Sequence, residues 1–86
     1  MLRITPLAEA PPRVTLKVEG RIAGEGVRVL EGECSGWIDR GYYVELDFAE
    51  VASVDHAGVV MLQQLPRSNV EIVNALPFIE ALLAEE

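Results

Sequence analysis

The stretch YYVELDFAEVASVDHAGVVMLQQLP, residues 42–66, joins a strand pattern to a helix pattern and decides the fold class of the chain. In its YYVELDF part, apolar side chains alternate with polar ones, which is the period of a half-buried β-strand. The run DHAGVVMLQQL, residues 55–65, is too apolar and too long for a strand, and Pro66 ends it as a helix. Ser53 and Asp55 are both candidate caps for this helix.

Two strands are predicted before this stretch. RVTLKVEG, residues 13–20, alternates most cleanly, with Val14, Leu16 and Val18 on one side. MLRIT, residues 1–5, alternates more briefly and is expected to stop at the following proline, because proline cannot donate a ladder hydrogen bond. We expect the two strands to pair as an antiparallel hairpin with a long connection, PLAEAPP.

Two further helices and one more strand complete the pattern. Residues 25–40 place apolar side chains three and four positions apart, which predicts a helix that Gly41 ends. NVEIV, residues 69–73, predicts a short strand, and a last helix is expected from about Asn74 with Pro77 in its first turn. Its expected buried face contains Phe78, Ile79, Leu82 and Leu83.

The resulting order, β-β-α-β-α-β-α, predicts an α/β fold with a four-stranded mixed sheet and about three helices. The chain has 86 residues, which is the size of one domain, so we expect residues 1–86 to form a single unit. Half of the residues are apolar, which argues against intrinsic disorder.

Composition excludes several classes of protein. A net charge of −7 with scattered basic residues disfavours nucleic-acid binding, which needs clustered Lys and Arg. A single cysteine and a single histidine exclude an internal disulfide and a Cys/His zinc cluster. The first residues lack the apolar core of a signal peptide, and no stretch is long and apolar enough to insert into a membrane. We therefore expect a cytoplasmic protein.

Asp55 and His56 are the main candidates for a site, because in open α/β sheets ligands and partners meet the loops that lead into helices. Cys34 as a nucleophile with His56 as its base is the enzymatic reading, but Cys34 lies on the apolar stripe of a helix, which favours core packing. A metal site is disfavoured, because the candidate ligands Asp47, Asp55 and His56 lack a fourth partner. DHAG also matches the D-x-x-G of nucleotide-binding switch proteins, but the chain has no P-loop. We therefore expect no catalysis, no metal and no cofactor, and keep nucleotide binding as an alternative.

The helix that follows Asp55 is the more informative element. Between Ala57 and Leu65 only Gln63 and Gln64 are strongly polar, and a domain of this size has little with which to cover such a helix. We expect some of its middle side chains to remain exposed, among Val59, Val60, Met61 and Leu62. A protein-docking face is slightly favoured over a fully covered core helix.

Three segments resemble a minimal STAS domain, the fold of bacterial anti-sigma-factor antagonists. They are VTLKVEGRI, YVELDFAEVASVDHAGVVMLQQL and NVEIVNALPFIEALL, and the match covers roughly residues 13 to 83. The resembled pattern is a strand that ends in glycine and an apolar residue, then a Leu-Asp pair and a D-x-x-G segment that runs into a helix. Leu46, Asp47, Asp55 and Gly58 carry its most specific part.

The resemblance implies a regulatory module that is not an enzyme and binds another protein, often an anti-sigma kinase. It implies docking through the loop after the Gly-ending strand, the D-x-x-G loop and the following helix. On this sequence the docking residues are Gly20, Arg21, Ile22, Asp55, His56, Gly58, Val59 and Leu62.

The family's usual phosphorylated serine is replaced here by His56, so the usual switch is absent, and Ser53 is the remaining weak candidate for phosphorylation. An accessory subunit of a lipid-transport ABC system, which clamps an ATPase, is the alternative within this class. A homodimer is also left open.

Because the D-x-x-G loop is expected at the surface, we expect Asp55→Lys to leave folding intact.

Overall fold

The structure is a computed structural model, which describes residues 1–84. Its elements follow the predicted order: β1 (Leu2–Ala10), β2 (Arg13–Ile22), α1 (Glu25–Asp39), β3 (Tyr43–Val54), α2 (His56–Gln64), β4 (Val70–Val73) and α3 (Pro77–Ala84). The strands form one sheet in the order β1-β2-β3-β4. β1 is antiparallel to β2, whereas the β2–β3 and β3–β4 pairs are parallel. The α/β class, the mixed four-stranded sheet and the three helices are therefore confirmed.

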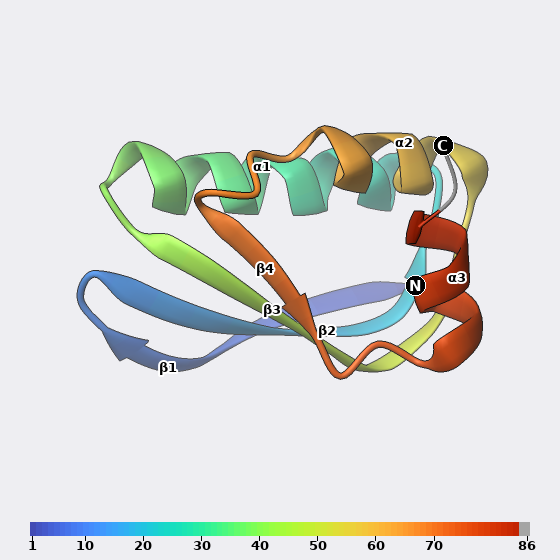
Figure 1. The fold of residues 1–86 in the computed structure, drawn as a ribbon, viewed down its shortest axis with the longest axis horizontal. Helices are drawn as coiled ribbons and strands as arrows, with labels where there is room; N and C mark the ends of the chain where they lie inside the picture. The colour runs from blue at the N-terminus through green and yellow to red at the C-terminus, as the bar shows by residue number, and fades with distance from the viewer. Residues whose placement is uncertain (85–86) are drawn as a thin grey trace.

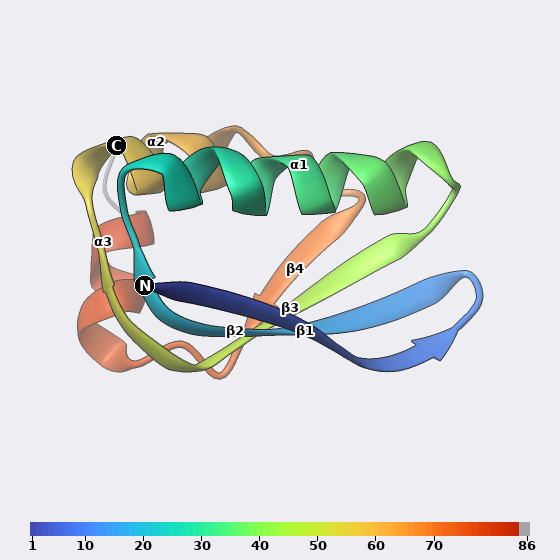
Figure 2. The same ribbon diagram turned by 180° about the vertical axis from the view of Figure 1, so that it is seen from behind.

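The helices lie mainly on one side of the sheet. α1 and α2 run side by side over one face, and α3 lies at the end of the sheet where these two helices begin (Figure 1; Figure 2 shows the reverse side). The other face is polar and carries pairs such as Thr15 Oγ1 donating to Glu45 at 3.0 Å. One face of each strand is therefore apolar and the other hydrated, as the alternation in the sequence predicts.

The core is built from the alternating side chains of the two central strands. Val14, Leu16 and Val18 of β2 are completely buried, and so are the side chains opposite them on β3, such as Leu46, the register partner of Leu16. From the helices the stripe of α1 joins them, with Leu30 fully buried. Each such side chain contributes roughly 1.5–3 kcal/mol relative to an exposed one.

The end of α1 agrees with the prediction, whereas α3 differs from it in its first residue and in its buried face. α1 ends at Asp39, and Gly41 beyond it adopts a φ of +87°, a left-handed conformation that suits glycine. α3 begins at Pro77, not near Asn74, because Asn74 itself has a φ of +62° and cannot belong to a helix. Phe78 was expected on the buried face but is 51 % exposed. That expectation was wrong because this short helix packs on the core along the side that carries Ile79, and Phe78 lies off that side.

The strands β1 and β3 are longer than predicted. β1 does not stop at Pro6: it continues to Ala10 with a bulge between Pro6 and Ala8, and its turn to β2 is short. A proline is tolerated there because β1 is the edge strand, where one side of the backbone needs no ladder partner. β3 does not end with the YYVELDF pattern but runs on to Val54. This extension carries β3 to the start of α2.

Candidate docking site at the start of α2

The candidate site lies where the two central strands end. Ile22, the last residue of β2, and Val54, the last of β3, are register partners in the parallel pair. Each strand then leads directly into a helix, so α1 and α2 both begin at this edge of the sheet (Figure 2). Helix N-termini carry unpaired N–H groups and partial positive charge, and two such helix starts lie together at this end of the sheet.

Asp55 ties the two loops at this edge together. Its Oδ1 accepts a hydrogen bond from Gly58 N at 2.7 Å, which caps α2, and its Oδ2 accepts one from Gly24 N at 3.2 Å. Its own N–H donates to the carbonyl oxygen of Ile22 at 3.0 Å. Of the two predicted caps, Asp55 is the one used and Ser53 is not. One carboxylate therefore fixes the loop after β2 against the first turn of α2.

These bonds change what a substitution at Asp55 should do. The expectation that Asp55→Lys leaves folding intact assumed a free surface side chain. Although the residue is exposed, its carboxylate satisfies two backbone N–H groups, and loss of a helix cap alone costs about 1 kcal/mol. A lysine there would also place a positive charge at the positive end of α2, so we expect Asp55→Lys to lower the stability of the fold.

Gly58 is buried and acts inside the fold. An ideal Cβ at this position would lie 2.8 Å from Val54 Cγ1 and 3.1 Å from both Ile22 Cγ2 and the Ile22 carbonyl oxygen. The first turn of α2 therefore sits directly on the ends of β2 and β3, and only glycine leaves room for it. The three-residue spacing between Asp55 and Gly58 is thus explained by capping and packing within the chain.

Gly20 is also explained by internal geometry. It has a φ of +94°, and the space a Cβ would occupy is taken by the Met1 carbonyl oxygen. That oxygen also accepts a hydrogen bond from Arg21 N at 3.1 Å. The first residue of the chain therefore lies beside the end of β2, and Arg21 is exposed to solvent.

The predicted docking residues divide into exposed and buried sets. Arg21, Asp55 and His56 are exposed, and Gly20 and Val59 are partly buried. The other three are buried and leave the accessible surface: Ile22, Gly58 and Leu62, the last with 6 % exposure. Gly58 and Leu62 lie on the side of α2 that packs inward, and Ile22 is a buried residue of β2.

Val60 and Gly24 also lie in this region, although neither was among the predicted docking residues. Val60 lies on the outer side of α2 with 37 % exposure, as the expectation for this apolar helix allowed, while Met61 is in the core. Gly24 enters through its N–H, which Asp55 binds across 31 positions of sequence. A glycine directly before a predicted helix is the only signal that pointed to it.

The other chemical candidates are not brought together here. Cys34 is buried, and burial, followed by the charges of Glu33 and Glu31, raises the pKa of its thiol to about 12. Asp47 is occupied elsewhere: its Oδ1 accepts from Ala49 N at 3.0 Å and from Asn74 Nδ2 at 3.3 Å.

Two findings bear on metal and membrane binding. In the part of the chain that the structure describes, no three acidic, His or Cys side chains gather as a metal site would require. None of the helices within residues 1–84 is long and apolar enough to cross a membrane.

Ser53, the remaining phosphorylation candidate, lies near the end of β3. It is partly buried, and its register partner across the parallel pair is Arg21. It therefore lies at the same edge as Asp55 but within a strand, not in the loop.

Comparisons with known proteins place the fold. No protein-family model and no curated protein sequence matches the chain. Among solved structures, the anti-sigma factor antagonist SpoIIAA in its unphosphorylated form matches with a TM-score of 0.75. The match covers 93 % of this chain and 80 % of that one, at 15 % sequence identity. The chain therefore has a STAS-like fold, the fold of an anti-sigma factor antagonist.

Proposed function

We propose that this chain is a non-enzymatic regulatory module that binds another protein at the start of α2. The docking surface consists of Arg21, Asp55, His56, Val59 and Val60. The observation that carries the proposal is the double hydrogen bond of the Asp55 carboxylate to Gly24 and Gly58. This bond pair holds two exposed segments in one fixed arrangement before any partner arrives, which lowers the ordering cost of binding.

The fold supports a regulatory partner. SpoIIAA is described as an anti-sigma factor antagonist, so an anti-sigma kinase-like protein is the partner class that we propose first. The accessory subunit of a lipid-transport ABC system, bound to its ATPase, is the second. His56 stands at the family's usual phosphoserine position, so regulation here would not use that serine. We place the module in the cytoplasm, where the free thiol of Cys34 would remain reduced.

The electrostatics at α2 argue against nucleotide binding. A phosphate at a helix N-terminus is held by unpaired N–H groups and the positive end of the dipole. Here the Asp55 carboxylate already accepts the N–H of Gly58, and its negative charge would repel a phosphate. Catalysis by Cys34 is disfavoured as well, because a buried thiol with a pKa of about 12 forms almost no thiolate at neutral pH.

The test uses variants that keep the fold and change the surface. His56→Glu puts an acid at the first position of α2, where the helix dipole stabilises it by about 0.3–1 kcal/mol. We expect this variant to fold at least as well as the parent. Its affinity for the partner captured from the native cell should fall by about tenfold or more, which is about 1.4 kcal/mol. Arg21→Glu should weaken the same complex.

The control is Arg40→Glu, which makes the same charge change as Arg21→Glu at the opposite end of α1. Partner affinity should not change with this variant once its folding has been checked by thermal unfolding. If His56→Glu and Arg21→Glu bind the partner as the parent does, the start of α2 is not the docking surface. A melting temperature that rises and saturates with added ATP would instead favour nucleotide binding.

A further inference from the structure

The two edges of the sheet are protected to very different degrees. β1 has a proline in its middle and a bulge at Leu7, both of which discourage another strand from pairing with it. β4 consists of Val70–Val73, contains no proline or lysine, and pairs with β3 without a register shift. In Figure 1 it lies at the front of the sheet, and no other strand of residues 1–84 lies beyond it. Its shortness is its only evident protection.

The hydrogen-bond pattern shows which backbone groups this edge offers. Val44 N of β3 donates to Asn69 O at 2.7 Å, so Asn69 and Glu71 face β3 in the parallel ladder. Val70 and Ile72 then face the open edge. Val70 N is occupied by the Pro66 carbonyl oxygen at 3.0 Å. The N–H and C=O of Ile72 and the C=O of Val70 are therefore directed toward a further strand.

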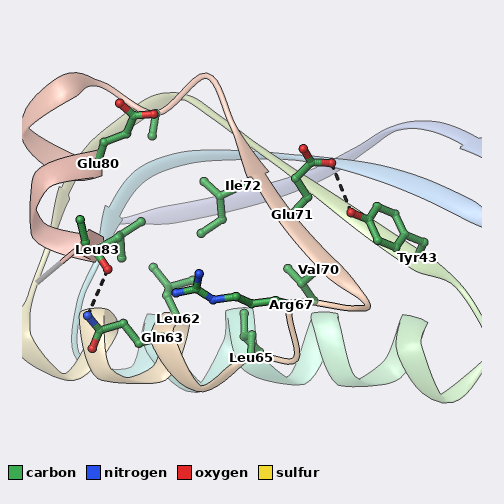
Figure 3. A pocket seen from close by; sticks show the side chains of 12 residues that line it. Tyr43, Leu62, Gln63, Leu65, Arg67, Val70, Glu71, Ile72, Glu80 and Leu83 are labelled. Carbon is green, nitrogen blue, oxygen red and sulfur yellow. Dashed lines mark hydrogen bonds between the residues drawn. The ribbon is translucent and has the colours of Figure 1, made fainter. Parts of the chain in front are cut away.

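A groove lies beside this edge. It has a volume of about 520 Å³ and lies between β4, the end of α2 and α3 (Figure 3). Its apolar lining comes from all three elements and from the segments that join them: Leu62, Leu65, Val70, Ile72, Ala75 and Leu83. Side chains of an added strand that point to the helix side of the sheet would enter this groove, and those on the other side would not.

The charges around the groove select the occupant. Glu71 alternates with Val70 and Ile72 along β4 and lies at the rim of the groove beside Tyr43, whose hydroxyl donates to Glu71 at 3.3 Å (Figure 3). Glu80 lies at the α3 side of the groove, and among the residues that the structure describes Arg67 is the one cation in the lining. The rim is thus net acidic, on a chain with a net charge of −7. An added strand would bind most tightly if the side chains that point away from the groove are basic.

We propose that the β4 edge and its groove bind an extended segment of a partner protein in which aliphatic residues alternate with Lys or Arg. The aliphatic side chains fill the groove, the basic ones face Glu71 and Glu80, and the segment's backbone pairs with Ile72. A second copy of this chain fits poorly, because two strongly acidic molecules would meet with their Glu71 side chains close together. This surface is separate from the start of α2 and does not depend on the function proposed there.

The test uses an acetylated and amidated peptide that alternates Val and Lys, with a peptide that alternates Val and Glu as its matched control. Titration of the ¹⁵N-labelled protein should move the amide resonances of β4 and Leu65 with the Val/Lys peptide and much less with the Val/Glu peptide. At saturation the Ile72 amide should exchange more slowly with solvent. The Glu71 amide, which already faces β3, serves as the internal reference.

Variants test the charge selection. Glu71→Lys should weaken the Val/Lys peptide by about fivefold or more and strengthen the Val/Glu peptide, since opposite and like charges across strands differ by about 1 kcal/mol or more. Glu33→Lys makes the same charge change on α1 and should alter neither affinity.

Four results would overturn the proposal. They are the absence of β4 shifts at millimolar peptide, equal binding of the two peptides, unchanged exchange at Ile72, or β4 shifts that follow protein concentration without any peptide.

Discussion

Gly58→Ala in α2 and Gly32→Ala in α1 are the same chemical change in two helices, and we expect opposite effects on the free energy of unfolding. At Gly32 no atom lies within 4 Å of the position that a Cβ would take. Alanine there should raise stability by about 1 kcal/mol, because it has the better helix propensity. Gly58 has the same propensity gain available but lacks the space.

The cost at Gly58 follows from the distances. Carbon atoms pack best about 3.5–4.0 Å apart. The new Cβ would lie 2.8 Å from Val54 Cγ1 and 3.1 Å from Ile22 Cγ2 and the Ile22 carbonyl oxygen. That oxygen also accepts the Asp55 N–H, so it cannot move freely. Crowding of this kind costs about 1–3 kcal/mol, so the net effect should be a loss of up to about 2 kcal/mol.

Urea denaturation of the parent and both variants measures the difference directly, provided that the m-value is unchanged. The two variants should differ by about 1–3 kcal/mol, and each kcal/mol should move the melting temperature by about 4–8 °C in a domain of this size. If Gly58→Ala is stabilised as much as Gly32→Ala, α2 does not rest on Ile22 and Val54 as described, and the account of the Asp55–Gly58 spacing fails.

Two other substitutions test the site and the core. Asp55→Ala should cost about 1–2 kcal/mol in urea denaturation because Gly24 N and Gly58 N lose their acceptor, whereas Asp55→Asn should cost less since one amide oxygen remains. Equal costs would mean that the remaining oxygen restores neither bond, and that the negative charge of the carboxylate is what stabilises the site. The Cys34 thiol should react with a thiol reagent at pH 8 only after unfolding. The pKa of the Cys34 thiol is about 12 in the folded protein and 9.0 in the unfolded chain. The protonated thiol should therefore stabilise the fold below about pH 9, and this stabilisation should decline as the pH rises toward 12. Cys34→Ala should reduce that decline.

The strand faces and the element order follow from local patterns. The alternation of Val14, Leu16 and Val18 predicts the buried face of β2, because successive side chains of a strand point to opposite sides. Asp55 as a cap is local in the same way, since its partner, Gly58 N, is three residues away. Such interactions lie within one element, so the sequence around them contains the information needed.

The boundaries that were missed depend on neighbours. Pro6 sits inside β1 because that strand has a partner on one side only, and the sequence of residues 1–10 does not show which strand forms the edge. Phe78 is exposed because α3 packs on the core along the side that carries Ile79 and Leu83. In each case the outcome is decided by what packs against the element.

The order of strands and helices, the apolar face of each central strand and the capped start of α2 can be read from local patterns, because these features depend on residues a few positions apart. No such pattern predicts that Leu62 and Gly58 face inward while His56 and Val60 face solvent, since helix burial depends on distant elements. Only the tertiary structure decided this, as it also decided that Asp55 reaches Gly24 and that β4 has an open edge with a groove beside it. These features join segments far apart in the chain, and no local pattern specifies such contacts.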